Sequence, residues 1–202
     1  MSDMISTIEI TLLISLPLIL FYQRNKLGFK KYSLYIVLLY LLWISTYAFL
    51  HETCHLFGSW ITGTIINDYQ LIPAFLEGDF QTAYVNSQFE NNTQAFVSGI
   101  MPYLQDIVCL IIGFLILRKN YLKNKLLTGL ILVLLILSPL YDIVNNYSGF
   151  IFESYWDFYM LSLRFGNYVV HTIGITFVLI SILFTIQIFK IYWKSSIILI
   201  EN

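Results

Sequence analysis

Residues 32–55 read YSLYIVLLYLLWISTYAFLHETCH, an uncharged run as far as residue 50 followed by two histidines and a glutamate. An α-helix rises about 1.5 Å per residue, so about 20 apolar residues cross the hydrocarbon core of a bilayer. A soluble domain is about 25% charged. This chain of 202 residues is 11% charged and 58% hydrophobic. The run therefore predicts a transmembrane helix in an integral membrane protein.

Similar apolar runs recur along the chain. We predict one all-α domain over residues 1–202 with five transmembrane helices, at about residues 5–22, 32–56, 95–117, 126–146 and 165–189. Lipid offers no partner to unpaired backbone groups, so spans are helices or closed barrels, and continuous apolarity excludes the alternation of barrel strands. Asp3 and Glu9 stand where a cleavable signal peptide has basic residues, so we expect residues 5–22 to remain as a span.

Lysines and arginines gather on one side of this polytopic bundle. They follow the first, third and fifth spans, and Arg164 alone falls on the other side. Because cytoplasmic loops are enriched in Lys and Arg, we expect a multi-pass protein of the cell membrane with its N-terminus outside and its C-terminus cytoplasmic. The net charge of −1 gives no electrostatic reason to expect a nucleic-acid partner. The expected partners are the lipid bilayer and membrane-embedded molecules.

This topology leaves two outer loops, residues 57–93 and 147–164. The first contains acidic residues and no lysine or arginine. The second is rich in aromatic side chains, which favour the membrane interface. We expect the acidic residues of the second loop, Glu153 and Asp157, to face solvent.

Near the outer end of the second span, His51, Glu52 and His55 form an HExxH motif. Helical positions i and i+4 share a face, so the two imidazoles can hold one metal ion. The glutamate between them is placed to act as a base toward water. A catalytic zinc ion has three protein ligands and an open position. The motif therefore predicts one zinc ion per chain and a third ligand elsewhere.

Membrane depth leaves two candidates for that third ligand. At 1.5 Å per residue from the outer helix ends, Asp142 lies about 7 Å deep and His171 about 9 Å deep, comparable with the two histidines. Asp106 lies about 16 Å deep, which is too far for a shared ion in an unbroken helix. Carboxylate and imidazole both bind zinc well, so depth alone leaves Asp142 and His171 as competing candidates.

Together these features resemble the site-2 protease family of intramembrane zinc metalloproteases over about residues 38–146. The first core helix of that family carries HExxH and a glycine eight residues later, where this chain has Gly63. The second carries small residues, a proline and an amide, and residues 98–105 read SGIMPYLQ, with Gln105 in place of the usual asparagine. The third carries a proline before the ligand aspartate, and residues 137–142 read LSPLYD, with Ile143 in place of the usual glycine.

The resemblance implies a three-helix metalloprotease core and hydrolysis of peptide bonds in transmembrane protein or peptide substrates. It favours Asp142 over His171 as the third zinc ligand and makes Glu52 the catalytic base. Gln105 is a candidate to stabilise the oxyanion, and His171 and Asn145 are candidates to support the site from outside. The family's site generally faces the cytoplasm, whereas the charge pattern here places it near the outer face. The alternative function is a non-proteolytic membrane protein that uses the same ligands for metal binding or regulation.

Overall fold

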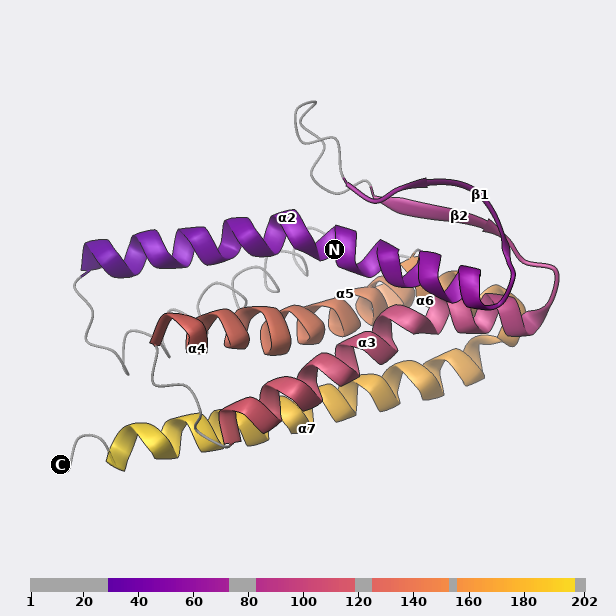
Figure 1. Ribbon diagram of the computed structural model, residues 1–202. Helices are drawn as coiled ribbons and strands as arrows, with labels where there is room; N and C mark the ends of the chain where they lie inside the picture. Colours follow the sequence, from indigo (N-terminus) through magenta and orange to yellow (C-terminus); the bar gives the residue numbers. More distant parts are fainter. Residues whose placement is uncertain (1–28, 73–82, 119–124, 153–155, 199–202) are drawn as a thin grey trace.

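The structure is a computed structural model that describes residues 29–72, 83–118, 125–152 and 156–198 (Figure 1). The predicted span at residues 5–22 lies outside the described residues. Within them, four helices are long and apolar enough to cross a membrane: Ser33–Ile61, Asn92–Arg118, Leu127–Phe152 and Asn167–Lys190. These four correspond to the last four predicted spans. The predicted helical membrane fold is thereby confirmed.

The helices run close to the predicted bounds. Their bounds are Phe29–Ile61 for α2, Asn92–Arg118 for α3, Lys125–Leu132 for α4, Val133–Leu137 for the π-helical η2, Ser138–Phe152 for α5, Trp156–Phe165 for α6 and Asn167–Ile198 for α7. Helices α2, α3 and α5 extend further at the predicted outer end, and α7 extends further at the predicted inner end. The segments α4, η2 and α5 follow one another without a break and form the predicted fourth span.

A glycine ends α2. Gly63 has a φ of 66°, the left-handed conformation that costs glycine little. The Thr64 N–H donates to the carbonyl of Ser59 at 2.8 Å, and the Gly63 N–H donates to the carbonyl of Trp60 at 3.1 Å. This is the Schellman pattern of a helix C-terminus. The glycine that follows the HExxH motif therefore turns the chain out of the bundle.

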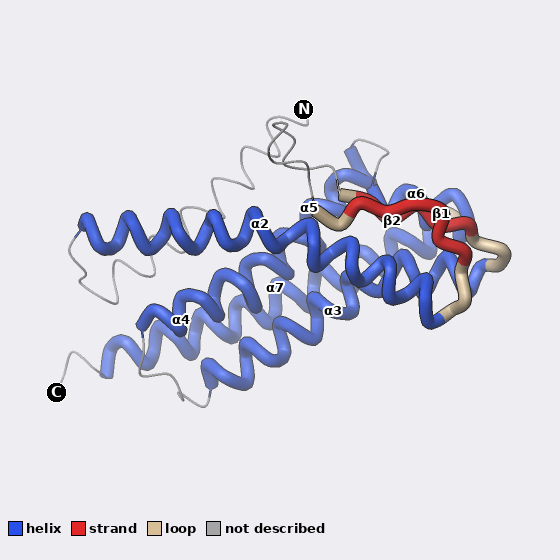
Figure 2. The backbone as a smooth tube through the Cα atoms, turned by 45° about the horizontal axis from the view of Figure 1, so that its top comes forward, coloured by secondary structure: helices blue, strands red, loops and turns tan. Residues whose placement is uncertain are grey.

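The long helices lie side by side (Figures 1 and 2). The first turn of α2, the end of α3, the start of α4 and the end of α7 all lie at one end of the bundle (Figure 1, left), and the described basic residues other than Arg164 belong to these helix ends. Arg164 lies in the last turn of α6 at the other end. The described basic residues other than Arg164 thus gather at one end of the bundle, and the predicted orientation of that end in the membrane stays a prediction.

The first outer loop contains a β-hairpin that the sequence did not reveal. Strand β1, Ile65–Gln70, pairs antiparallel with β2, Tyr84–Gln88, with an irregularity between Ile66 and Asp68. The strands are short and rich in polar residues, so they lack the strong alternation that identifies strands in a sequence. The hairpin lies over the C-terminal end of α2, at the same end of the bundle as α6 (Figure 1).

Helix α3 is the centre of the packing and contacts α2, α5, α6 and α7. Its Tyr103 is fully buried and stacks on Phe158 of α6, with ring centroids 4.6 Å apart. Ile143 of α5 is fully buried in the same cluster. These contacts pack α6 against α3 and α5. Helix α6 is therefore part of the bundle and not a separate segment that lies along the membrane interface.

A π-helical turn precedes Pro139. The Ser138 N–H donates to the carbonyl of Val133 rather than to a carbonyl four residues back. Proline has no N–H to continue the α-helical ladder, and irregular turns of this kind accompany prolines and functional sites. The helix is therefore irregular just before Pro139, and the next turn of α5 buries Asp142.

Candidate metal centre

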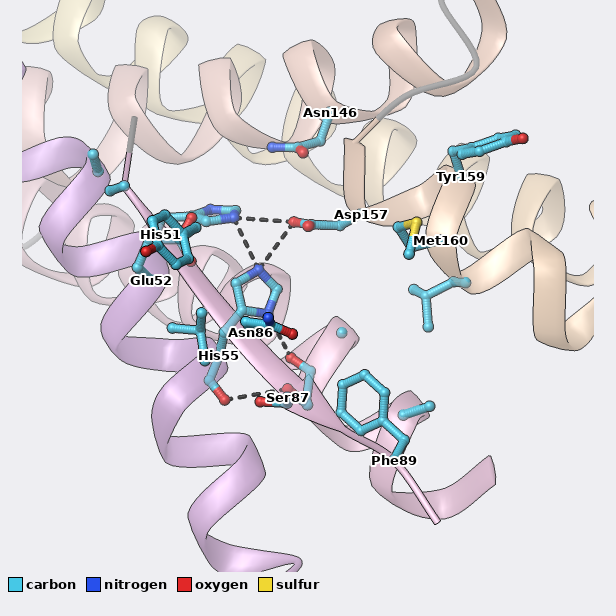
Figure 3. Close-up of a pocket in the computed structure, with 18 of the residues that line it drawn as sticks. His51, Glu52, His55, Asn86, Ser87, Phe89, Asn146, Asp157, Tyr159 and Met160 are labelled. Atoms are coloured by element: carbon cyan, nitrogen blue, oxygen red, sulfur yellow. Dashed lines mark hydrogen bonds and ion pairs between the residues drawn. The ribbon is translucent and has the colours of Figure 1, made fainter. Parts of the chain in front are cut away.

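The two histidines of the HExxH motif point at one carboxylate. The Nε2 atoms of His51 and His55 lie 3.1 Å apart on one face of α2. The Oδ2 atom of Asp157 lies 3.0 Å from the first and 3.1 Å from the second. Figure 3 shows the three side chains converging from α2 and α6. We call these three residues the His–His–Asp cluster, and in the described part of the chain they form a group that could hold a metal ion.

The surrounding acceptors fix which nitrogen of each ring faces the cluster. The Nδ1 atom of His51 lies 2.7 Å from Oδ2 of Asp142, and the Nδ1 atom of His55 lies 2.8 Å from the carbonyl oxygen of Ser98. Because both partners are acceptors, each Nδ1 donates a proton and each Nε2 of a neutral ring keeps its lone pair. Two lone pairs and a carboxylate oxygen thus meet within about 3 Å, an arrangement that calls for a cation or a proton between them.

A proline makes the Ser98 carbonyl available to His55. In an α-helix the carbonyl of residue 98 accepts the N–H of residue 102, but that residue is Pro102 and has no N–H. A buried carbonyl needs a partner, and the ring of His55 supplies one. The small-residue and proline motif at residues 98–102 therefore acts on the cluster by holding His55.

Small residues let α2 and α3 approach closely at this point. A Cβ atom on Gly58 would lie 2.8 Å from the Cα atom of Ser98. The hydroxyl of Ser59 lies 2.9 Å from that of Ser98 and 3.0 Å from that of Ser87 on β2. The hydroxyl of Ser98 donates to the carbonyl of His55 at 3.2 Å. These bonds join α2, α3 and β2 beside the cluster.

Asp142 lies behind His51, on the ring nitrogen that faces away from the cluster. Its Oδ1 atom accepts hydrogen bonds from the Tyr47 hydroxyl at 2.7 Å and from Nδ2 of Asn146 at 2.8 Å. A carboxylate that holds the far nitrogen of a metal-binding histidine fixes its tautomer and orientation. The predicted role of Asp142 as a direct ligand stays a prediction, and this geometry favours the supporting role.

The carboxylate beside the two histidines belongs to Asp157 and not to Asp142, the residue that the resemblance favoured as third ligand. The prediction that Asp157 faces solvent is wrong: its side chain is 28% exposed and accepts a hydrogen bond from the Tyr103 hydroxyl at 2.8 Å. Burial alone raises the pKa of this carboxyl, but protonated histidine rings, through the charge of His55 and hydrogen bonds from both Nε2 atoms, hold the pKa well below its usual range. The carboxylate is therefore ionised at neutral pH, the form that binds metals.

The other predicted site residues are spread around the cluster. Glu52 lines the pocket described below. Gln105 accepts a hydrogen bond from Cys54 and is not among the described residues that line that pocket. Nδ1 of His171 lies 3.0 Å from the Tyr147 hydroxyl, and neither residue is among the described residues that line that pocket. Asn145 accepts a bond from Ser148 through its carbonyl oxygen, and the support expected of it comes from its neighbour Asn146.

A pocket of about 770 Å³ opens beside the cluster. Its walls come from α2, β2, α3, α5 and α6, and Figure 3 shows β2 passing close to the histidines. Glu52 lies in its wall next to His51 and makes no hydrogen bond within the described residues. The cluster is therefore open on one side to a space large enough for a short peptide.

No protein-family model, curated protein or solved structure matches this chain. Any proposal of function therefore rests on the geometry of the cluster and its pocket and on the sequence motifs described above.

Proposed function

We propose that this chain is an intramembrane zinc metalloprotease that hydrolyses peptide bonds of membrane-embedded substrates. The observation that carries the proposal is the convergence of two imidazole Nε2 atoms and one carboxylate oxygen, with both Nδ1 atoms held by acceptors. Two histidines and a carboxylate, with one position left open, are a usual ligand set for catalytic zinc. His51, His55 and Asp157 are the proposed ligands.

The dimensions of the cluster suit zinc. Ligand distances of 2.0–2.2 Å in a tetrahedron correspond to donor atoms about 3.3–3.6 Å apart. The three donor atoms lie 3.0, 3.1 and 3.1 Å from one another. A small outward movement of each side chain therefore makes room for the ion.

Glu52 is the proposed catalytic base. Bound zinc would supply a Lewis acid that polarises the scissile carbonyl and promotes ionisation of water. Glu52 takes a proton from the attacking water and returns it to the leaving amine. Asp142, itself held by Tyr47 and Asn146, keeps the ring of His51 in the orientation that binding requires.

The hairpin offers a place for the substrate backbone. In the described residues β2 pairs only with β1, so its other edge has no strand partner. The same strand lines the pocket. An extended peptide can add to a free strand edge through main-chain hydrogen bonds, which would hold the scissile bond in the extended form that hydrolysis needs.

The test is Glu52→Gln in the purified, zinc-loaded chain with a transmembrane peptide substrate. We expect cleavage to fall at least about 100-fold, because a general base contributes that much, while zinc stays at one per chain. Glu90→Gln, which changes an exposed acid outside the pocket, is the matched control and keeps full activity. Cleavage retained in Glu52→Gln contradicts the mechanism. Stoichiometric zinc with no cleavage by the wild type of any membrane peptide favours the metal-binding or regulatory alternative.

A further inference from the structure

One strongly basic side chain lines the pocket of the His–His–Asp cluster. Asp157, Met160, Leu161 and Arg164 all line it, and their spacing of three, four and seven residues places them on one face of α6. Arg164 is the only lysine or arginine among the described lining residues, which also include Glu52. Helix α6 therefore supplies the cluster with a carboxylate at one end and the pocket with a guanidinium at the other.

Arg164 is held in place without being neutralised. Its guanidinium lies over the ring of Phe89, 5.4 Å from the centroid. It donates to the carbonyl of Phe89 at 3.2 Å and to the carbonyl of Asn91 at 3.5 Å. Within the described residues it forms no ion pair with a carboxylate. Because a guanidinium has five N–H donors, donors remain and the positive charge is available to a ligand.

The charge, shape and position of this group indicate what it can bind. Guanidinium groups bind carboxylates through paired, charge-assisted hydrogen bonds. Seven helical residues separate Arg164 from Asp157, a rise of about 10 Å. An extended peptide advances about 3.3 Å per residue, so about three substrate residues cover that distance.

We propose that Arg164 forms a subsite for a substrate carboxylate about three residues from the bond that is cut. This inference rests on the proposed function, which it deepens by naming a class of substrate. The carboxylate belongs either to an acidic side chain or to the C-terminus of the substrate. An otherwise apolar membrane peptide would in this way be selected by one negative charge at the outer end of the bundle.

The test measures binding in zinc-loaded Glu52→Gln protein in a neutral detergent, by anisotropy of fluorescent apolar peptides. One set carries a single Glu stepped along the sequence and an amidated C-terminus. A second set carries Gln at the same positions, and a third peptide carries Gln and a free C-terminus. We expect the best Glu peptide or the free C-terminus to bind at least about tenfold more tightly than its neutral counterpart. Whichever of the two does so identifies the source of the carboxylate.

Charge exchange separates recognition from a structural role. Adding Arg164→Gln should remove the preference with zinc still at one per chain, and adding Arg164→Glu should transfer it to the matching Lys peptide. Arg118→Gln, at the opposite end of the bundle, is the control and should change neither. The inference is overturned if all peptides bind equally or if none binds. It is also overturned if Arg164→Glu loses binding of the Glu peptide and the matching Lys peptide does not restore it. Displacement of the peptide by phosphatidylglycerol only when Arg164 is present also overturns it, in favour of a lipid headgroup.

The two proposals fail separately, because this binding is measured in a variant that cannot cleave. A charge preference without any cleavage by the wild type would support the Arg164 subsite and contradict the protease function. Cleavage without a charge preference would support the protease function and contradict the subsite.

Discussion

Each imidazole of the cluster is held at its far nitrogen by a different acceptor. His51 is held by a buried carboxylate and His55 by a helix carbonyl. The carboxylate adds negative charge next to the ring, so it strengthens the ring as a ligand as well as orienting it. Loss of the charge should therefore weaken zinc binding without abolishing it.

We predict that Asp142→Asn lowers zinc affinity about 10-fold to 100-fold, as substitutions of residues that support a metal ligand do. The amide oxygen can still accept the proton of His51, so the ring keeps its orientation while the charge is lost. Competition with a chelator of known zinc affinity measures the change. Unchanged affinity would show that Asp142 does not act through His51, and a loss as complete as that of His51→Ala would restore Asp142 as a direct ligand.

The sequence predicted two of the three residues of the cluster, His51 and His55. The spacing of His51 and His55 required only that residues 51–55 be helical, and Glu52 followed from the same motif. Asp157 could not be predicted in this way, because about 100 residues of chain separate it from the histidines and only the packing of α6 brings it back. The one available signal was an acidic residue in a strongly aromatic outer loop, on the same side of the membrane as the histidines.

Two features of α2 and α3 position His55, the close approach at Gly58 and the unused carbonyl before Pro102. Both depend on how α2 and α3 pack together: Gly58 of α2 lies against the backbone of α3, and the Ser98 carbonyl of α3 accepts a hydrogen bond from α2. Each gives a prediction at the scale of the element.

Gly58→Ala should force the two helices apart. Its new Cβ would meet backbone, the Cα atom of Ser98 at 2.8 Å, and overpacking of this kind costs about 1–3 kcal/mol. We expect a lower free energy of unfolding and weaker zinc binding, measured by denaturant titration and chelator competition. The control is Gly99→Ala, whose Cβ would meet only the Leu161 side chain, which can move. An equal or larger effect in the control would contradict the assignment of the critical contact to Gly58.

Pro102→Ala should return an N–H to the Ser98 carbonyl. That donor then competes with the ring of His55. Because a carbonyl can accept two hydrogen bonds, we expect zinc affinity to fall by less than about tenfold, with the helix content in circular dichroism unchanged. Unaltered affinity would indicate that the carbonyl serves both donors equally well.

The elements themselves were predictable to different degrees. Apolar runs of about 20 residues identify spans because burial in lipid demands them. The hairpin escaped prediction because its strands, Ile65–Gln70 and Tyr84–Gln88, are short, and part of the polar sequence that they contain faces the pocket.

At the scale of the whole molecule, the described basic residues other than Arg164 lie at the end of the bundle opposite to the His–His–Asp cluster (Figure 1). The positive-inside rule then places the cluster near the outer face. We predict that a membrane-impermeant maleimide labels Tyr168→Cys on intact cells, in a chain whose Cys54 and Cys109 are replaced by alanine. Tyr168 is 92% exposed and lies in the first turn of α7, at the end of the bundle that holds the cluster. Arg118→Cys, at the basic end, should react only after permeabilisation, and the opposite pattern would reverse the topology.

The central claim is that His51, His55 and Asp157 together hold one zinc ion. The measurement that tests it most directly is the metal content of purified Asp157→Ala beside the wild type, by elemental analysis after equilibration with zinc and removal of weakly bound ions. The wild type should carry one zinc ion per chain and Asp157→Ala almost none, with both proteins folded by circular dichroism. Zinc retained at one per chain in Asp157→Ala would contradict the account.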